Sequence, residues 1–340
     1  MPGTIVSFAS INIDDVYSVP HIVRPGETIS SGGVRQSAGG KGTNASVAAA
    51  RAGGRVRVVG KVGADGAWVR DVIAGAGADV DQVAVVDGAA TGRAIIQVDP
   101  RGENAILLLP GANHALGADD ARRALAGCGP GDWLLLTNET TGVAAAISLA
   151  RGRGMRVLWN PAPVGPGVVA AVRPEGLVDV LVVNEGELVA LAQQLDGVDL
   201  LPEAGADRHV GIGRQVAGRL GCRVVVVTLG SAGSVGLVRR RLGGGDGVAI
   251  RMECAPVRPD QVRDTTAAGD TWVGYFAAEL ARLQGGSPDE GEIAPAAVER
   301  AMRVATYASG IAVTRAGAVP SIPARAEVDA FLGTSSLGAV

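Results

Sequence analysis

Short apolar strands alternate with helix-forming stretches along most of this chain, and this alternation is the strongest constraint on its fold. The clearest strand is Val224–Val227, four β-branched residues in a row, a composition that favours extended backbone. Helix-forming runs such as Ala45–Ala52 stand between the strands at intervals of roughly 25–35 residues. The other predicted core strands are Thr4–Ala9, Arg55–Gly60, Val83–Val86, Leu134–Glu139, Arg156–Trp159 and Val178–Val183. The pattern predicts an α/β fold, with a doubly wound, mostly parallel sheet and helices on both of its faces.

Two polar segments interrupt the alternation and are predicted to form a separate small sheet. Residues 15–38 contain two prolines and short β-branched pieces, and residues 91–109 contain two short strands around a turn. Since neither segment is apolar enough for the core, we expect them to pair with each other as a β lid. The predicted α/β core comprises residues 1–14, 39–90 and 110–332, in which residues 196–213 form an exposed loop, and residues 333–340 form a flexible tail.

Composition excludes several classes of function. The chain has 340 residues, of which 47% are hydrophobic and 19% are charged, so it can bury a large core. Its net charge of −3 gives no support to nucleic-acid binding, and no apolar run reaches the ~18 residues that a membrane span needs. We therefore expect a cytoplasmic protein without nucleic-acid or membrane partners. The three cysteines and three histidines are scattered, so neither a disulfide framework nor a histidine-ligated metal is predicted.

The stretch Asp264–Trp272 carries the strongest chemical signal. Small residues separate two carboxylates, Asp264 and Asp270, and an apolar helical run follows. The first N–H groups of a helix have no partners within it and form a site for an anion, most often a phosphate. One interpretation is that Asp270 is a general base beside an anion hole made by the three preceding N–H groups. Those groups belong to Ala267, Ala268 and Gly269. The alternative is that Asp270 only caps a helix on a surface loop, because aspartate is a favoured cap residue.

A glycine-rich segment, Gly39–Asn44, precedes a strong helix former. It is not a phosphate-binding P-loop, because Gly42 rather than Ser or Thr follows the lysine. One interpretation is a glycine floor at which the backbone closely approaches a small polar ligand, with Lys41 and Asn44 hydrogen-bonded to that ligand. The alternative is a flexible turn with a surface lysine. Because the chain has only two lysines, Lys41 and Lys61, against 29 arginines, the ligand role is favoured.

Polar residues follow several predicted core strands at the point where each strand ends. In an open α/β sheet these carboxyl ends lie along one edge, where such folds bind ligands. Taken singly, each residue could equally be a turn residue or the solvated first turn of a helix. Together they provide carboxylates, amides and backbone donors, which suit a polyol at one end and a phosphate ester at the other. The residues are Asn12, Asp14, Glu139, Asn160, Asn184, Glu187, Thr228 and Gly230.

These motifs together resemble the ribokinase-like (PfkB) family of carbohydrate and nucleoside kinases, and within it the ribokinases most. The similar stretches follow the family's order over nearly the whole chain. They are residues 10–14, 39–44, 160–163, 184–187, 228–231, 264–270 and 312–321. The resemblance implies an ATP-dependent sugar kinase that converts D-ribose to D-ribose 5-phosphate, with Asp270 as the base for the 5-hydroxyl. In one departure from the family's pattern, Trp272 stands where a phenylalanine is usual.

The resemblance also implies a role for each candidate residue. ATP, Mg²⁺ and an activating K⁺ are the implied cofactors, and the lid sheet is the implied contact of a homodimer. Asn184 and Glu187 resemble the motif that organises the nucleotide phosphates and Mg²⁺, which Glu187 contacts indirectly. The implied sugar ligands are Asn12, Asp14, Gly40, Lys41, Asn44 and Glu139. The other implied nucleotide contacts are Thr228, Gly230, Ser231, Gly233, Gly269 and Thr306. The implied ligands of the monovalent cation, most of them through backbone carbonyls, are Asp264, Thr266, Ala312, Arg315, Gly317 and Ser321.

Three other functions stand against this expectation. A kinase for deoxyribose, fructose or a nucleoside uses the same chemistry, but a nucleoside needs an aromatic-rich pocket, and only 3% of the residues are aromatic. A non-catalytic sugar- or nucleotide-binding regulator is favoured where Asp270, the glycine-rich segment or Glu187 is missing, and all three are present. A dinucleotide-dependent oxidoreductase needs a G-x-G-x-x-G motif after the first strand, and the chain has none there.

Overall fold

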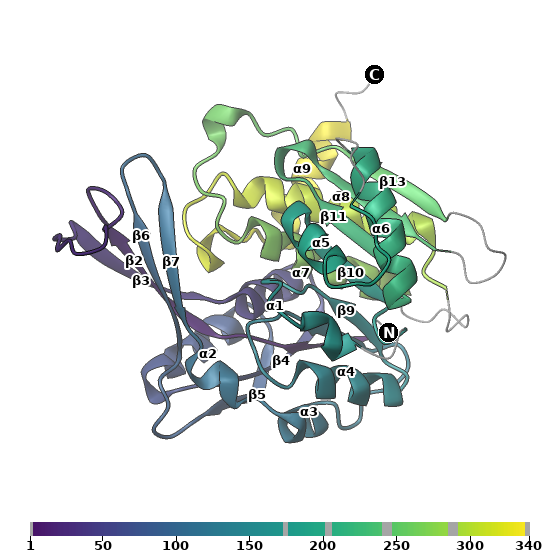
Figure 1. The fold of residues 1–340 in the computed structure, drawn as a ribbon, viewed down its shortest axis with the longest axis horizontal. Helices are drawn as coiled ribbons and strands as arrows, with labels where there is room; N and C mark the ends of the chain where they lie inside the picture. Colours follow the sequence, from purple (N-terminus) through teal and green to yellow (C-terminus); the bar gives the residue numbers. More distant parts are fainter. Residues whose placement is uncertain (1–2, 173–175, 201–205, 240–246, 285–291, 337–340) are drawn as a thin grey trace.

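The computed structural model describes residues 3–172, 176–200, 206–239, 247–284 and 292–336, and these form two separate β-sheets (Figure 1). Within these residues the larger sheet has nine strands, in the order β13-β12-β11-β10-β9-β8-β1-β4-β5. The strands from β11 to β5 pair in parallel, whereas β12 and β13 are antiparallel at one edge. The strands are β1 (Thr4–Phe8), β4 (Arg55–Val62), β5 (Asp79–Val85), β8 (Trp133–Leu136), β9 (Arg156–Trp159), β10 (Val180–Asn184), β11 (Val224–Thr228), β12 (Ser234–Val238) and β13 (Val248–Met252).

Helices cover both faces of this sheet, which confirms the predicted doubly wound α/β fold. They are α1 (Lys41–Arg51), α2 (Ala67–Gly75), α3 (Ala118–Ala124), α4 (Val143–Gly152), α5 (Glu185–Ala192), α6 (Ala206–Leu220), α7 (Ala268–Gln284), α8 (Pro295–Ala312) and α9 (Arg325–Ser336). One face packs against α1, α2, α7 and α8, and the other against α3, α4, α5 and α6. Val224 and Val226 belong to the first layer, and Val225 and Val227 to the second, which explains the unbroken β-branched run. Among the described helices, none combines the length and apolarity that crossing a bilayer requires.

The predicted lid sheet is also present and projects from one side of the body (Figure 1). Its strands, in the order β3-β2-β6-β7, are β2 (Asn12–Ser18), β3 (Gly33–Gly39), β6 (Gly92–Val98) and β7 (Asn104–Leu109). The pairing is antiparallel except between β2 and β6, which are parallel. β2 begins three residues before the predicted lid boundary, because the chain runs on from β1 through buried Ile11 and Ile13 without a turn. Asn12 and Asp14 therefore lie on a lid strand and not at the end of a core strand.

Three segments differ from the sequence-based expectation. α6 begins at Ala206, inside the predicted loop 196–213, because buried Ile212, Val216 and Leu220 recur at helical spacing; residues 201–205 lie outside the described residues. α9 continues to Ser336, past the predicted start of the tail at residue 333, and residues 337–340 lie outside the described residues. The sequence does not predict β12 and β13, because a glycine interrupts the first and only the middle residue of the second is buried.

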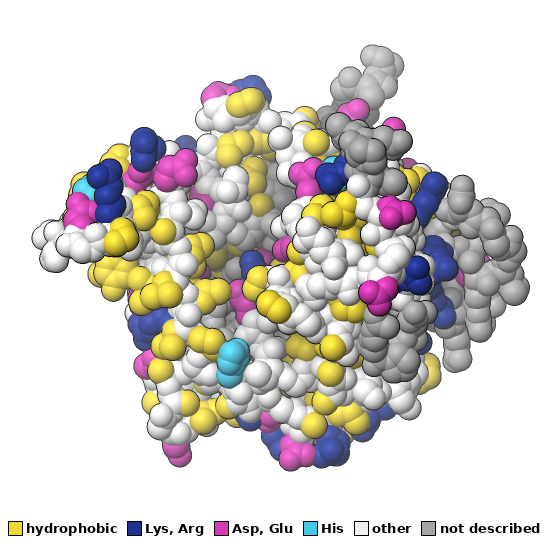
Figure 2. Space-filling model, in the orientation of Figure 1, with side chains coloured by type: hydrophobic (Ala, Val, Ile, Leu, Met, Phe, Trp, Pro, Cys, Tyr) yellow, Lys and Arg dark blue, Asp and Glu magenta, His cyan; other side chains and the backbone are white. Residues whose placement is uncertain are grey.

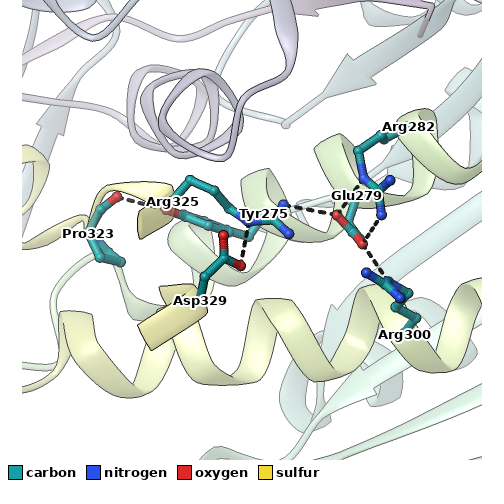
Figure 3. A network of polar contacts seen from close by, with 7 residues as sticks. All are labelled: Tyr275, Glu279, Arg282, Arg300, Pro323, Arg325 and Asp329. Atoms are coloured by element: carbon teal, nitrogen blue, oxygen red, sulfur yellow. Dashed lines mark hydrogen bonds and ion pairs between the residues drawn. The ribbon is translucent and has the colours of Figure 1, made fainter. Parts of the chain in front are cut away.

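Helix α7, which carries Asp270, is held in place by an ion cluster around one buried carboxylate (Figure 3). The side chain of Glu279 is 1% exposed and accepts hydrogen bonds of 2.6–3.1 Å from three guanidinium groups. The donors are Arg282, Arg300 and Arg325. Burial alone would raise the pKa of Glu279, but these hydrogen bonds outweigh burial and lower the pKa to about 2. Tyr275 adds a hydrogen bond of 2.8 Å to the carbonyl of Pro323, so α7 is tied to α8 and to the segment that enters α9.

Candidate active site

The carboxyl ends of the parallel strands and the lid border a recess in which basic and acidic side chains lie close together (Figure 2). Two adjoining cavities share the lining residues Thr228, Thr265 and Gly269. We call them the carboxylate cavity, of about 210 Å³, and the apolar cavity, of about 370 Å³. Predicted site residues that line the carboxylate cavity are Lys41, Asn184, Glu187, Thr228, Ala267, Gly269 and Asp270. Those that line the apolar cavity are Thr228, Gly230, Ser231, Gly233, Ala268, Gly269 and Thr306.

The glycines before α1 are required by close approach of the backbone. Gly40 has a φ of 92°, in the left-handed region that glycine adopts most easily. A Cβ atom on Gly42 would lie 2.3 Å from the backbone nitrogen of Ser10, and one on Gly39 would lie 2.0 Å from the carboxylate of Asp14. Side chains at these positions would displace β1, β2 or Asp14. This close packing argues against a flexible turn, and Lys41 of the same segment lines the carboxylate cavity.

Glu139 lies at the start of α1, although it follows β8 in the sequence. Its Oε2 accepts a hydrogen bond from the backbone N–H of Lys41 at 3.0 Å and another from Oγ of Ser10 at 2.7 Å. Oγ of Ser10 in turn accepts the N–H of Gly42 at 3.0 Å. The carboxylate thus satisfies orphan donors and the positive end of the helix dipole. Its Oε1 has no hydrogen-bond partner among the described residues and remains available as an acceptor.

Asp14 is an almost buried carboxyl, 8% exposed, on strand β2. Burial raises its pKa to about 7; the charges of Glu139, Asp270 and Asp15 add to the rise, and Lys41 opposes it. Among the described residues, none donates a hydrogen bond to the Asp14 carboxyl group. A carboxyl group in such surroundings is suited to accept a hydrogen bond from a ligand hydroxyl group, which would supply the missing donor.

Asp270 lies in the first turn of α7, where its Oδ2 accepts a hydrogen bond of 2.8 Å from Nδ2 of Asn44. Burial raises the pKa of Asp270, as do Glu139 and Glu187, whereas the charge of Lys41 and the Asn44 hydrogen bond lower it. Conversely, the charge of Asp270 is the largest influence raising the pKa of Lys41, against the effect of burial. The ammonium group of Lys41 is therefore influenced by carboxylates from several elements that lie far apart in the sequence.

The turn before α7 offers backbone N–H groups to both cavities. Ala267 has a φ of 58°, a left-handed conformation that is unfavourable for a residue with a Cβ atom. Within the described residues, no acceptor pairs with the N–H groups of Ala267 and Gly269, whereas the N–H of Ala268 donates to the carbonyl of Thr265 at 3.2 Å. Two of the three predicted anion-hole donors are therefore unpaired here, and the third belongs to the turn. A Cβ atom on Gly269 would meet nothing within 4 Å, so this position opens onto the recess.

The apolar cavity combines a polar rim with largely apolar walls. The chain between Thr228 and Gly233 forms the rim after β11. The apolar walls are formed by Ala255, Val257, Val262, Trp272 and Val313. Trp272 stacks on Phe276 with ring centroids 4.8 Å apart, and its Nε1 lies 3.3 Å from Oγ1 of Thr306, to which it donates. The cavity suits a flat, largely apolar group with polar edges, such as a nucleobase.

Asn184 and Glu187 form a reciprocal capping box at the start of α5. The N–H of Glu187 donates to Oδ1 of Asn184 at 2.8 Å, and the N–H of Asn184 donates to Oε2 of Glu187 at 2.9 Å. Burial raises the pKa of Glu187, while the hydrogen bond from Asn184 and the charge of Lys41 lower it. No group of three or more His, Cys, Asp or Glu residues forms a metal cage within the described part of the chain. Mg²⁺ bound to phosphates and water needs only one or two carboxylates, and Glu187 fits that role.

Asp264 joins the two segments that are predicted to hold a monovalent cation. Its Oδ1 accepts the N–H of Thr266 at 2.9 Å, and its Oδ2 accepts the N–H of Gly317 at 2.8 Å. Burial alone would raise the pKa of Asp264, but hydrogen bonds from the side chain of Thr266 and from these two N–H groups lower it. The carboxylate and nearby carbonyl oxygens keep further lone pairs, and oxygen ligands suit a hard cation. These oxygen ligands therefore fit the predicted monovalent cation.

Two of the remaining predicted cation ligands, Ala312 and Gly317, have no polar side chain. The side chain of Arg315 pairs with Glu327, and Oγ of Ser321 donates to the carbonyl of Ala318 at 2.7 Å. The carbonyl of Ala312 accepts the N–H of Arg315 at 3.0 Å. Ala312 and Arg315 would thus contact a cation only through carbonyl oxygens, whereas Oγ of Ser321 also keeps lone pairs for such a contact.

Sequence reasoning missed two buried residues of the site, Ser10 and Asn113. Ser10 bonds Glu139, and Asn113 donates to Asn12 at 2.7 Å. No local sequence signal distinguishes them, because Asn113 is followed by His114 and Ser10 stands two residues before Asn12. The second lysine, Lys61, has a structural role instead, because its Nζ binds the carbonyl of residue 115 at 2.7 Å and the carboxylate of residue 120 at 2.8 Å. Of the two lysines, only Lys41 therefore lies in the candidate site.

The sequence and the fold match known proteins over nearly their whole length. Residues 3–325 match the model of the pfkB family carbohydrate kinase. A ribokinase of Haemophilus influenzae is 35% identical over 336 residues, which cover 98% of this chain and 99% of that protein. The structure of a ribokinase from Cryptococcus neoformans var. grubii in complex with ADP has a TM-score of 0.78 and 32% identity, covering 96% of this chain and 99% of that one. The structure of Arabidopsis thaliana ribokinase complexed with ribose and ATP has a TM-score of 0.78 and 26% identity, covering 97% and 98%.

Proposed function

The chain belongs to the pfkB family of carbohydrate kinases, and on this basis we propose that it transfers the γ-phosphoryl group of ATP to the 5-hydroxyl of D-ribose. The products are D-ribose 5-phosphate and ADP. The observation that carries this proposal is the junction of the two cavities. Gly269 lines both cavities, and Asp270, the next residue, lines the carboxylate cavity. A base and unpaired N–H groups thus lie where a polyol and a nucleotide would meet.

Asp270 acts as the general base in this proposal. Phosphoryl transfer needs mainly positioning, charge neutralisation and a group that accepts the proton of the attacking hydroxyl. Asn44 holds the carboxylate through the hydrogen bond of 2.8 Å. Burial raises the pKa of Asp270, which strengthens it as a base, while Lys41 favours its ionised form. The proton of the 5-hydroxyl passes to Asp270 as its oxygen attacks phosphorus.

The sugar occupies the side of the recess next to the carboxylates. Asp14 and Oε1 of Glu139 offer acceptors, and Oδ1 of Asn44 is a buried acceptor without a partner among the described residues. Lys41 offers a donor, and Gly40 allows the ligand to approach the backbone. Since no aromatic side chain is among the described residues that line the carboxylate cavity, a polyol is favoured over a nucleoside.

The transferring phosphoryl group lies at the start of α7. The N–H groups of Ala267 and Gly269 and the helix dipole provide positive charge at this point. When bound, Mg²⁺ neutralises charge on the nucleotide phosphates, and Glu187 and Asn184 are placed to orient it through water. The segments that Asp264 joins would hold K⁺, and they support the turn that presents the N–H groups. The nucleobase occupies the apolar cavity.

The proposal includes a homodimer formed through the lid and a cytoplasmic location. The strand register aligns Asp15 with Ile95 and Ile95 with Leu107, so these side chains lie on the lid face opposite Asp14. Ile95 is 37% exposed, Leu107 is 67% exposed and Leu109 is 50% exposed. Exposed apolar side chains of this kind are typical of a protein–protein contact, and the same face carries the ion pair between Arg93 and Asp15.

The function is tested by incubating the purified protein with ATP, Mg²⁺ and K⁺ and a panel of D-ribose, 2-deoxy-D-ribose, D-fructose and adenosine. ADP release measures turnover, and NMR of the product locates the phosphate. We expect D-ribose to have the highest kcat/KM, with phosphate on O5. Phosphorylation of none of these acceptors, or a higher kcat/KM for adenosine, contradicts the proposal.

A further inference from the structure

Asn113 is buried beside Asn12, a predicted sugar-binding residue, but has no role in the proposed phosphoryl transfer. It lies in the short helical turn Gly111–Ala115, directly after β7, and is 1% exposed. Its Oδ1 accepts the backbone N–H of Ile11 at 2.8 Å, and its Nδ2 donates to Oδ1 of Asn12 at 2.7 Å. Asn113 therefore acts on Asn12 and not on the ligand itself.

These two hydrogen bonds determine the orientation of both amide groups. A backbone N–H can only donate, so the atom of Asn113 that faces Ile11 must be its carbonyl oxygen, and the other must be its NH₂ group. This NH₂ group donates to Asn12, which therefore turns its own carbonyl oxygen toward Asn113. The NH₂ group of Asn12 has no acceptor among the described residues. Its nitrogen is not fully buried. It is left as a donor that is accessible to a ligand.

Strand β6 of the lid covers the hydrogen bond between the amide groups of Asn113 and Asn12. A Cβ atom on Gly92 of β6 would lie 2.2 Å from Nδ2 of Asn113 and 2.3 Å from Oδ1 of Asn12. Glycine at this position thus allows the strand to pack directly on the bond, and both asparagines are at most 4% exposed. If the amide of Asn12 turned over, two NH₂ groups would face each other with little water to compensate.

We propose that Asn113 is a positioning residue that makes Asn12 a hydrogen-bond donor to the sugar, an inference that rests on the proposed function. Asn12 and Asp14 are two residues apart on β2 and lie on the same face of that strand. A donor from Asn12 and an acceptor from Asp14 therefore stand side by side. Such a pair recognises two neighbouring hydroxyl groups, one accepting from Asn12 and the other donating to Asp14.

The test compares Asn113→Asp with Asn113→Ala. In Asn113→Asp one carboxylate oxygen still accepts the Ile11 N–H, but the other repels the carbonyl of Asn12. The amide of Asn12 then turns its NH₂ group to the new carboxylate and presents an acceptor to the sugar. We expect KM for D-ribose to rise by about 10- to 100-fold, with kcat and KM for ATP changed less than about threefold. The alanine variant leaves Asn12 free to turn and should raise KM by a smaller factor.

The order of the two variants separates positioning from general support of the fold. If Asn113 only stabilises the structure, alanine, which removes both hydrogen bonds, is the more damaging change, and this order overturns the inference. Asn12→Asp also replaces the donor by an acceptor, so its effect on KM should not add to that of Asn113→Asp; full additivity contradicts the inference. Asn104→Asp, the same change on exposed β7, is the matched control and should leave KM unchanged.

Two further outcomes keep the inference distinct from the proposed function. If the unmodified protein phosphorylates no D-ribose, the proposed function fails. If it is active and Asn113→Asp, with an unchanged thermal midpoint, has the same KM for D-ribose, only the inference fails. Should Asn113→Asp not fold, the alanine variant decides alone, and an unchanged KM in that variant refutes positioning.

Discussion

Replacing Asp14 by asparagine should stabilise the ligand-free protein, although it removes a proposed sugar-binding group. Asp14 is 8% exposed, and burial, aided by neighbouring carboxylates, raises its pKa from 3.8 to about 7. One pKa unit corresponds to about 1.36 kcal/mol, so the ionised carboxyl destabilises the folded state by on the order of 4 kcal/mol above pH 7. Asparagine keeps the shape of the side chain and cannot ionise, so most of this destabilisation should disappear.

The pH dependence of this effect has a defined sign. Because the pKa of Asp14 is raised on folding, the folded protein binds a proton more tightly than the unfolded chain between pH 3.8 and about 7. The stabilising contribution of the protonated carboxyl is complete below that range and is lost as the pH rises through it. The advantage of Asp14→Asn should therefore be near zero at the acid end and largest above pH 7.

Calorimetry of both proteins without ligand, across this pH range, measures the effect. With an unfolding entropy of about 2.1 cal/mol/K per residue, ~4 kcal/mol raises the Tm of a chain of this length by roughly 5–6 °C. Asp71→Asn on the exposed face of α2 is the matched control, and surface changes of this kind stay within about 0.5 kcal/mol. The reasoning is refuted if Asp14→Asn has the same or a lower Tm at pH 8, or a difference from the unmodified protein that does not change with pH.

Three other predictions concern the ammonium group, the cation and the lid. Lys41→Met removes the main influence that lowers the pKa of Asp270, so the acid limb of the kcat profile should move to higher pH; an unmoved limb would exclude this coupling. Exchange of K⁺ for tetramethylammonium should lower kcat, and Asp264→Ala should abolish the difference between the two ions; equal rates in both ions for the unmodified protein contradict the cation site. Leu107→Glu on the exposed lid face should give a monomer in sedimentation, whereas Ile106→Glu on the opposite face is the control; a persistent dimer in Leu107→Glu argues against the lid contact.

The large sheet could be predicted because its strands carry an unambiguous pattern. Val224–Val227 is buried on both faces, and helices on both sides of the sheet make four consecutive β-branched residues favourable. The polar residues that end such strands, including Glu139 and Asn184, must then lie along one edge. Segments with mixed signals were harder to assign, as in α6, where glycines at 211 and 213 hide the helical spacing of its buried residues.

The contacts within the site could not be derived from local pattern. Ser10 bonds Glu139 across 129 residues, and Asn44 bonds Asp270 across 226 residues. Both pairs depend on how the strands and helices pack, which no window of sequence contains. The orientation of an amide such as that of Asn113 is set by one backbone N–H of another segment. The same limit applies to Ala268, whose N–H donates to the carbonyl of Thr265 within the turn.

The measurement that tests the central claim most directly is the turnover of Asp270→Asn with D-ribose and ATP, combined with its affinity for ATP. The oxygen of the new amide can still accept the hydrogen bond from Asn44, so the site should keep its shape. Loss of the general base predicts a fall in kcat of roughly 10²- to 10⁴-fold, with the Kd for ATP within about twofold of the unmodified protein. Turnover within a few-fold of the unmodified protein would contradict the assignment of Asp270 as the base.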